Sequence, residues 1–300
     1  MIYELCLKIG IPEDGAKILE ESLFIILSKK ESAILLAKAQ EELMNGDNNY
    51  ENTIGEISEK SGVHMYTAGL CFMLYAARSL KYIYAAKGLD EEIFCDSMKD
   101  LSYKYNECMT VYGIHGIFTY LWYKRFFLLR LFALGRMEYG INEFIFDSFT
   151  TKNGKHTLKR GDRVYDCHIP SSGRFPMDEV MASLKKAYGF FVSIGEVKNG
   201  ELMPVTCHSY LLYPENRHLF REGSNIRNFV ELFELVPESV YAEENNPNFW
   251  RIFGKEYKKG MKDIPRDTTL RKAFADHIEN GGCMGVGYGV LYFDGEKIVE

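Results

Sequence analysis

The sequence predicts a helical N-terminal domain over residues 1–135 and a second domain, of the α/β or α+β type, over residues 136–300. Hydrophobic residues recur at helical spacing as far as Gly135, and short β-prone segments alternate with helical ones after it. A length of 300 residues favours two domains. The chain is 46% apolar and 14% aromatic, which supplies large cores and excludes a disordered polypeptide.

The first domain is expected to be helical throughout. Residues 13–30 and 70–87 carry apolar side chains on one face. A third helix begins at Asp90, a good N-cap, and ends at Gly113. Residues 115–134 are apolar nearly all round, and they therefore predict a buried central helix.

The second domain is expected to contain one mixed sheet whose strands alternate with helices along the chain. Glycine and asparagine turns separate its short β-prone segments. A polar stretch, residues 150–162, is interpreted as a hairpin-type loop within this domain. The expected strands are residues 137–149, 163–169, 205–213, 249–254 and 283–293, and the expected helices are residues 176–191, 215–234 and 268–280.

Charge and composition exclude several classes of partner. Thirty-six basic and 42 acidic residues leave a net charge of −6, which gives no attraction to nucleic acid or to an anionic membrane. A faint helix-turn-helix pattern over residues 53–72 lacks the basic side chains of a recognition helix. No stretch is long and apolar enough to span a membrane, and the N-terminus lacks the features of a signal peptide. Seven scattered cysteines indicate reduced core thiols in a cytoplasmic protein.

One loop is a candidate anion site. Residues 164–180 predict a strand, a short loop containing Ser171, Ser172, Gly173 and Arg174, and a helix that begins directly afterwards. Backbone N–H groups at a helix start attract phosphate, a glycine allows close approach, and an arginine adds charge. A single glycine also fits an ordinary strand-to-helix turn, so both interpretations stay open.

The strand before this loop carries a candidate acid–base pair. Alternation along a strand places Asp166 and His168 on one face, immediately before the loop. A carboxylate beside an imidazole suits proton abstraction from an amine or a hydroxyl group. The alternative is that both side chains only hydrogen-bond to backbone near the end of the sheet.

Two Cys-His dipeptides, Cys167-His168 and Cys207-His208, do not indicate a zinc site. Adjacent residues of a strand point to opposite faces, so neither pair can bind one metal ion. The cysteines are interpreted as core residues, and no metal is expected.

Several segments resemble a family of predicted bacterial acyltransferases, which combine an N-terminal helical N-acyltransferase domain with a C-terminal GNAT-like domain. The resemblance lies in LFALGRMEYG at the junction and in CHIPSSG, TCHSYLLYP, SNIRNF and IPRDTTLRKAFADHIENGG in the second half. It covers the second half well in order and spacing, and the helical half more loosely through YAAKGLDEEIFCDSMKDL and YGIHG.

The resemblance implies a mixed-sheet GNAT-like fold that binds an acyl-CoA, acetyl-CoA or another one, as co-substrate. The acyl group would pass to the amine of a small molecule or peptide. In GNAT folds two parallel strands splay apart and the loop after the first wraps the pyrophosphate. That role would fall to Ser171, Ser172, Gly173 and Arg174, and Ser224 with Asn225 would open a helix beside the cofactor.

If the chain is such an enzyme, direct attack on the thioester needs a neutral amine, and the candidate catalytic residues lie on the two strands. His168 is the expected general base, with Asp166 orienting it or acting in its place, and His208 is the alternative base. Tyr210, expected on the same face as His208, would protonate the leaving thiolate. The competing hypothesis is a non-catalytic GNAT-like domain that binds a ligand or a partner.

Overall fold

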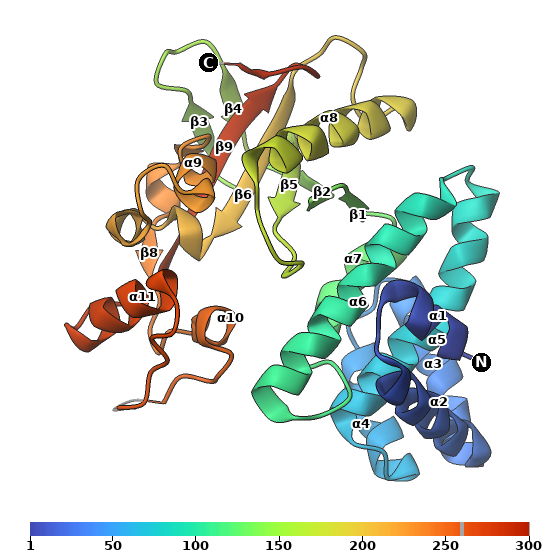
Figure 1. The fold of residues 1–300 in the computed structure, drawn as a ribbon. Helices are drawn as coiled ribbons and strands as arrows, with labels where there is room; N and C mark the ends of the chain where they lie inside the picture. The colour runs from blue at the N-terminus through green and yellow to red at the C-terminus, as the bar shows by residue number, and fades with distance from the viewer. Residues whose placement is uncertain (259–260, 300) are drawn as a thin grey trace. The chain divides into compact units, whose positions relative to one another are not determined.

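The structure is a computed structural model that describes residues 1–258 and 261–299 and divides into two compact units (Figure 1). The first unit contains Met1–Ala133 together with Pro170–Ser172. The second contains Leu134–Ile169 and the chain from Gly173 onward.

The first unit is helical, and the helices predicted near residues 13–30, 70–87 and 90–113 are confirmed. α5 is buried along most of its length, with an unbroken run of buried residues from Thr67 to Leu74, and is therefore the central helix of this unit. The elements are α1 (Tyr3–Ile9), α2 (Glu13–Ser28), α3 (Lys30–Met44), α4 (Tyr50–Ser61), α5 (Met65–Ala86), α6 (Glu91–Tyr112), the 3₁₀ helix η1 (Tyr120–Tyr123) and α7 (Lys124–Phe127).

Local sequence signals set the ends of α6. The Asp90 carboxylate accepts a hydrogen bond from the Glu92 backbone N–H at 2.9 Å, which satisfies one of the unpaired donors at the helix start. At the other end Gly113 takes a left-handed conformation with φ of 68°. Glycine adopts that conformation without steric cost, so the helix stops there.

The prediction of a helix over residues 115–134 is wrong. These residues form a loop, η1, α7 and the first strand of the sheet, although most of the apolar side chains are buried as expected. A Cβ at Gly116 would lie 2.4 Å from the Tyr66 carbonyl carbon, and the Ile117 N–H donates to the Tyr66 oxygen at 3.0 Å. This contact with a distant part of the chain holds the segment outside a helix. An apolar run without periodicity does not distinguish a helix from other buried structure.

The second unit is built on a mixed sheet, as predicted. Its strand order is β1-β2-β5-β6-β9-β10, and β7 and β8 pair with β9. Among the strand pairs whose register the structure describes, β5 with β6 is parallel, and β2 with β5, β6 with β9, and β9 with β10 are antiparallel. The strands are β1 (Leu131–Leu134), β2 (Met137–Glu143), β5 (Arg163–His168), β6 (Met203–Ser209), β7 (Glu234–Leu235), β8 (Tyr241–Ala242), β9 (Gly285–Phe293) and β10 (Ile298–Val299), beside a separate hairpin of β3 (Ser148–Thr150) and β4 (Thr157–Lys159).

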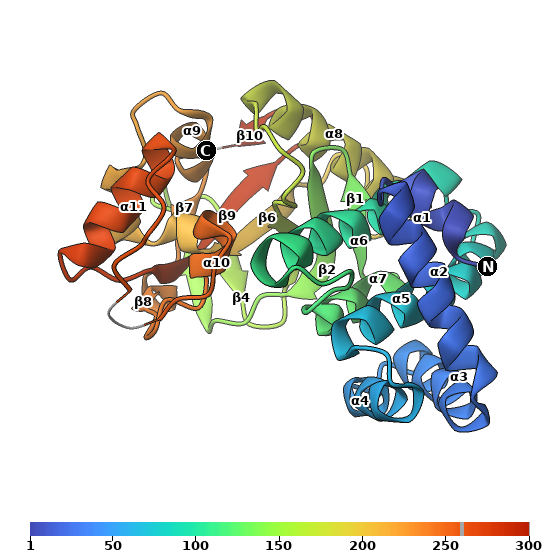
Figure 2. The same cartoon turned by 60° about the horizontal axis from the view of Figure 1, so that its bottom comes forward.

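Helix α8 (Met177–Ser193), predicted from residues 176–191, is the crossover between β5 and β6 and lies across one face of the sheet (Figures 1 and 2). Ser183 fixes it there, because its hydroxyl donates to the Leu134 carbonyl at 2.6 Å and accepts from the Met137 N–H at 3.1 Å. The rings of Tyr165 and Phe191 pack at 4.5 Å between centroids. The opposite face of the sheet is covered by the β3–β4 hairpin, through Phe149 and Leu158.

Beyond the sheet, the second unit contains a group of short helices with its own apolar core. Some of the secondary-structure predictions for these residues are wrong. Residues 249–254, predicted as a strand, form a helix instead, because Phe249, Ile252 and Phe253 are buried at helical spacing against the helix that was predicted at 268–280. The predicted helix over 215–234 is two shorter helices. The elements are η2 (Tyr210–Leu212), η3 (Pro214–Leu219), α9 (Asn225–Val230), η4 (Pro237–Ser239), α10 (Phe249–Phe253) and α11 (Thr269–Glu279).

The glycines of GVGYG allow close packing on one face of β9. A Cβ at Gly285 would lie 2.5 Å from the Tyr213 ring, and a Cβ at Gly287 would lie 2.6 Å from the Leu212 carbonyl oxygen. Tyr288, on the opposite face of the strand, joins the apolar core beneath the β3–β4 hairpin. Among the described residues, no helix has the length and apolar character needed to cross a bilayer.

Candidate functional site

The parallel pairing of β5 and β6 is short. Tyr165 pairs with Val205 and Asp166 with Thr206, while β5 continues to His168 and β6 to Ser209 beyond the last register pair. The two strands therefore lose their ladder at their carboxyl ends. Those ends carry His168 and His208.

Asp166 and His168 lie on one face of β5 and are in direct contact. The His168 Nε2 is 2.5 Å from Asp166 Oδ2. The two side chains keep 23% and 12% of their surface exposed, so the pair is sheltered but open to a small molecule. A carboxylate that holds one ring nitrogen fixes the orientation of the imidazole, as a general base requires.

His208 lies on the neighbouring strand and remains exposed to solvent. Partial burial of its ring lowers the pKa of His208, the nearby His168 lowers it further, and the Glu243 carboxylate raises it. Its ring lies 6.3 Å from that of Tyr288, its partner across the antiparallel pair with β9. The structure thus brings both predicted histidines and Asp166 into one neighbourhood.

Tyr210 does not share a face with His208, contrary to prediction. The Ser209 hydroxyl accepts from the Leu211 N–H at 3.1 Å and turns the chain out of β6 into η2. The Tyr210 ring then packs edge-on against Phe274, with 6.3 Å between centroids. Burial raises the pKa of its hydroxyl, so the group stays protonated, but the side chain belongs to the apolar core of the short helices.

The loop between β5 and α8 has an open, left-handed turn at Gly173. Its φ is 96°, and no described atom lies within 4 Å of the position of a Cβ. Arg136 holds this turn: Nε donates to the Arg174 carbonyl at 2.8 Å, and Nη2 donates to the Gly173 carbonyl at 3.2 Å. The guanidinium also lies 4.9 Å from the centre of the Phe175 ring. Two arginines and an accessible backbone therefore meet at this turn.

Two features of the loop oppose anion binding. The Ser171 hydroxyl donates to the Glu107 carboxylate at 2.5 Å, and the Ser172 N–H donates to the Pro170 carbonyl at 2.8 Å. The first turn of α8 carries Asp178 and Glu179, which already complement the helix dipole. Gly173 and Arg174 thus remain the better candidates of the four loop residues.

Ser224 and Asn225 stand at the start of α9, beside this loop. The Phe175 ring packs edge-on against Phe229 of α9, with 5.0 Å between centroids. The Ser224 hydroxyl accepts from the Arg227 N–H at 3.3 Å and caps the helix. The helix that was predicted to lie beside the cofactor therefore packs next to the loop, while the Ser224 side chain is engaged in capping.

Sequence reasoning missed three residues of this neighbourhood. Glu138 on β2 is directly opposite His168, on the same face, and is only 3% exposed. Burial raises the pKa of Tyr288 to about 12, and the nearby Asp166 contributes to the shift. Arg136, described above, is the third. The alternation of GVGYG could have indicated that Tyr288 faces away from the glycine side, but nothing local indicates which strands become neighbours.

The two cysteines of these strands are core residues. Cys167 and Cys207 are both buried, and the hydrogen bond between them together with burial raises the pKa of Cys167 well above its usual value. A thiol with a raised pKa is a poor nucleophile. Among the described residues, no group of three or more His, Cys, Asp or Glu side chains could hold a metal ion.

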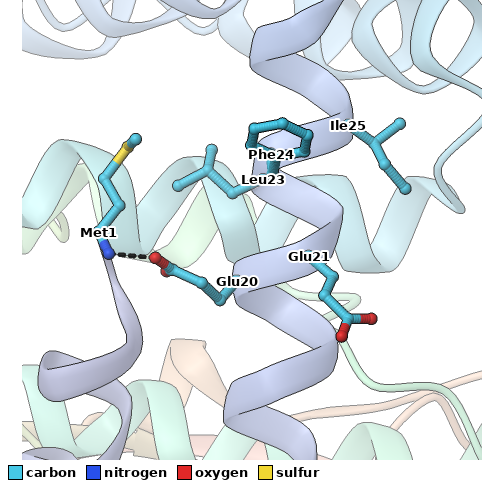
Figure 3. A pocket seen from close by; sticks show the side chains of 6 residues that line it. All are labelled: Met1, Glu20, Glu21, Leu23, Phe24 and Ile25. Atoms are coloured by element: carbon cyan, nitrogen blue, oxygen red, sulfur yellow. Dashed lines mark hydrogen bonds and ion pairs between the residues drawn. The ribbon is translucent and has the colours of Figure 1, made fainter.

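An apolar hollow of about 370 Å³ lies elsewhere, between Met1 and α2 (Figure 3). Met1, Leu23, Phe24 and Ile25 line it, and the Glu20 carboxylate at its edge binds the N-terminal amine. It offers neither an imidazole nor a nucleophile, so it is not a candidate active site.

Comparison with solved structures identifies the class of fold. An acyltransferase in complex with decanoyl-CoA and teicoplanin is 18% identical, with a TM-score of 0.70 over 96% of this chain and 86% of that chain. An acyltransferase mutant in complex with octanoyl-CoA is also 18% identical, with a TM-score of 0.69 over the same shares. At these identities the likeness establishes the fold, a helical region followed by a GNAT-like mixed sheet.

Family comparison agrees with the fold. Residues 1–129 match the family described as N-acyltransferase N-terminal domain, and residues 131–291 match the GNAT-like C-terminal domain. The chain therefore belongs to the family of acyltransferases that combine these two domains, and the resemblance noted from the sequence is confirmed. No curated protein matches the chain.

Proposed function

We propose that the protein is an acyl-CoA-dependent N-acyltransferase whose general base is His168, oriented by Asp166. The observation that carries this proposal is the 2.5 Å contact of the two side chains at the carboxyl end of β5, where the pairing with β6 ends. Family membership supports acyl transfer as the reaction class.

The residues of the loop fit the pyrophosphate of an acyl-CoA substrate. The space around the Cβ position of Gly173 is open, and Arg174 is exposed and carries a positive charge. Because Asp178 and Glu179 stand nearby, backbone donors and Arg174 would have to outweigh them. Bound there, the substrate supplies an acyl thioester.

The remaining chemistry falls to groups of this chain. His168 would take the proton of the amine, whose nitrogen then bonds to the thioester carbonyl carbon as the carbon–sulfur bond breaks. The departing thiolate needs a proton, and Tyr288, which is protonated at neutral pH and lies near Asp166, replaces Tyr210 as the candidate donor. His208 is the alternative base.

Two finer points belong to the same proposal. The acyl group is acetyl or longer, and the solved neighbours hold octanoyl- and decanoyl-CoA. The acceptor is the amine of a small molecule or a peptide, and one neighbour is complexed with teicoplanin. We also propose a cytoplasmic location, since the seven cysteines are free thiols.

Thermal stability tests the binding step. A ligand that binds only the native state stabilises it by about 2.7 kcal/mol at a hundredfold excess over its dissociation constant. Acetyl-, octanoyl- and decanoyl-CoA should raise the melting temperature, and pantetheine should do so far less. Gly173→Val, which forces a β-branched residue into a left-handed turn, should abolish the shift. An equal shift in this variant would remove the loop from the site.

Turnover tests the chemical step. His168→Ala should lower acyl transfer by about 100- to 10,000-fold while the thermal shift with acyl-CoA persists. His208→Ala is the matched change on the neighbouring strand and should cost less. A protein that binds acyl-CoA but transfers no acyl group to any amine would support the non-catalytic alternative. Full activity of both variants would show that neither histidine is the base.

A further inference from the structure

A polar cavity lies in the loop that follows β8, a strand that pairs with β9. Its volume is about 390 Å³, and Glu243, Glu244, Asn245, Asn246 and Tyr257 are among the residues that line it. This volume falls in the range that holds small molecules. No step described so far uses it.

The loop that forms the cavity has a defined backbone conformation and is hydrogen-bonded to Met284, the residue before β9. Asn245 and Asn246 both have positive φ, 60° and 46°, a conformation that asparagine tolerates better than most residues. The Glu243 N–H donates to the Met284 carbonyl at 2.9 Å, and Asn246 Oδ1 accepts from the Met284 N–H at 2.8 Å. The cavity wall is therefore held in place before any ligand binds.

The lining suits a cation. Glu243 Oε2 accepts from Asn248 Nδ2 at 2.7 Å, and a carboxylate has lone pairs for further donors. Glu244 is exposed and adds a second negative charge. Tyr257 contributes an aromatic ring, braced at 5.3 Å by Phe249, and aromatic faces attract ammonium groups.

The Arg251 guanidinium next to Asn248 is engaged by two groups outside the cavity lining. Arg251 Nε donates to Asn248 Oδ1 at 3.0 Å, and its guanidinium lies 4.4 Å from the centre of the Trp250 ring. Glu243 and Glu244 thus place two carboxylates in the lining of the cavity. The field of Glu243 extends to His208, whose charged form it stabilises.

We propose that this cavity binds the ammonium group of the acceptor, and that the acceptor is a small cationic amine that carries no carboxylate. The inference rests on the proposed acyl transfer, because His208 links the cavity to His168. An amine held at Glu243 would be delivered to the histidines, whereas an amino acid would bring its carboxylate against Glu243 and Glu244.

Two amines of equal chain length distinguish a cationic amine acceptor from an amino acid acceptor. 1,4-Diaminobutane carries an ammonium group at the end where 4-aminobutanoate carries a carboxylate. Calorimetric titration of the full chain without acyl-CoA should show the diamine binding at least tenfold more tightly. Equal affinity for the two compounds would overturn the proposal.

Conservative variants locate the binding. Glu243→Gln keeps an oxygen for Asn248 and should weaken diamine binding by about tenfold. Glu244→Gln, at an exposed position, should weaken it by about two- to fivefold. Glu238→Gln, an exposed glutamate outside the cavity, is the matched control and should change nothing. Wild-type affinity in Glu243→Gln would refute the assignment.

Kinetics distinguish a failure of this inference from a failure of the proposed function. In Glu243→Gln the KM for the diamine should rise by about tenfold, while the KM for acyl-CoA stays unchanged. An unchanged KM for the diamine would refute the cavity and leave acyl transfer intact. Diamine binding that depends on Glu243, without any acyl transfer, would refute the transferase and the acceptor role while retaining a cation site.

Discussion

Replacement of Gly287 by alanine tests the close packing on β9, next to the candidate site. The added Cβ would lie 2.6 Å from the Leu212 carbonyl oxygen, about 0.8 Å short of the 3.4 Å at which ordinary contact begins. The obstacle is backbone, and the Leu212 side chain is buried, so neither can move aside freely. Overpacking of this kind costs about 1–3 kcal/mol.

The assay is thermal and urea denaturation of matched glycine-to-alanine variants. For a domain of this size, each kcal/mol lowers the melting temperature by about 2–4 °C. Gly189→Ala is the control: Gly189 is exposed within α8 with no described atom near its Cβ position, so it should gain about 0.5–1 kcal/mol.

The same pair of variants should separate in activity. Gly287 pairs with Ser209, the residue after His208, so a shift of the backbone there disturbs the end of β6. Acyl transfer should fall in Gly287→Ala and stay unchanged in Gly189→Ala. If Gly287→Ala is as stable and active as the wild type, the close approach of β9 to Leu212 does not constrain the fold.

Three further outcomes follow from single contacts. Asp90→Ala removes the N-cap of α6 and should cost about 1 kcal/mol in urea denaturation, whereas Asp90→Asn, which keeps a capping oxygen, should cost less. Phe191→Ala removes a fully buried ring that packs on Tyr165, and should cost about 3–5 kcal/mol; a loss below 1 kcal/mol would contradict this packing. Because burial lowers the pKa of His208 below its usual value of 6.5, the unfolded chain binds more protons just below that pH. The wild-type melting temperature should therefore fall as the pH drops below about 6.5, and His208→Asn should fall less steeply over that window.

Local signals determined much of the helical unit and many of the strands and helices that follow it along the chain. The Asp90 cap, the stop at Gly113 and the start of α11 at Thr268 act through neighbouring residues, so the sequence contains them. The alternation that put Asp166 and His168 on one face is equally local, and the contact between them follows from it.

Where the secondary structure of a short segment was predicted wrongly, the burial of most of its apolar side chains was still predicted correctly. Residues 115–134 are buried in an irregular segment because Gly116 packs on the Tyr66 backbone. Residues 249–254 became a helix because the core shared with α11 needs Phe249, Ile252 and Phe253 on one side. Short apolar runs are compatible with either period, and the partner surface decides.

The sequence by itself determined the two halves, the helix ends and the pairing of Asp166 with His168, because these depend on residues a few positions apart. The tertiary structure alone decided that Glu138 faces His168 across a strand pair and that Glu243 lies within electrostatic reach of His208. It also turned Tyr210 out of β6 into a different core. These relations join segments that are far apart in the chain. They are determined by strand register and side-chain packing, which no local pattern specifies.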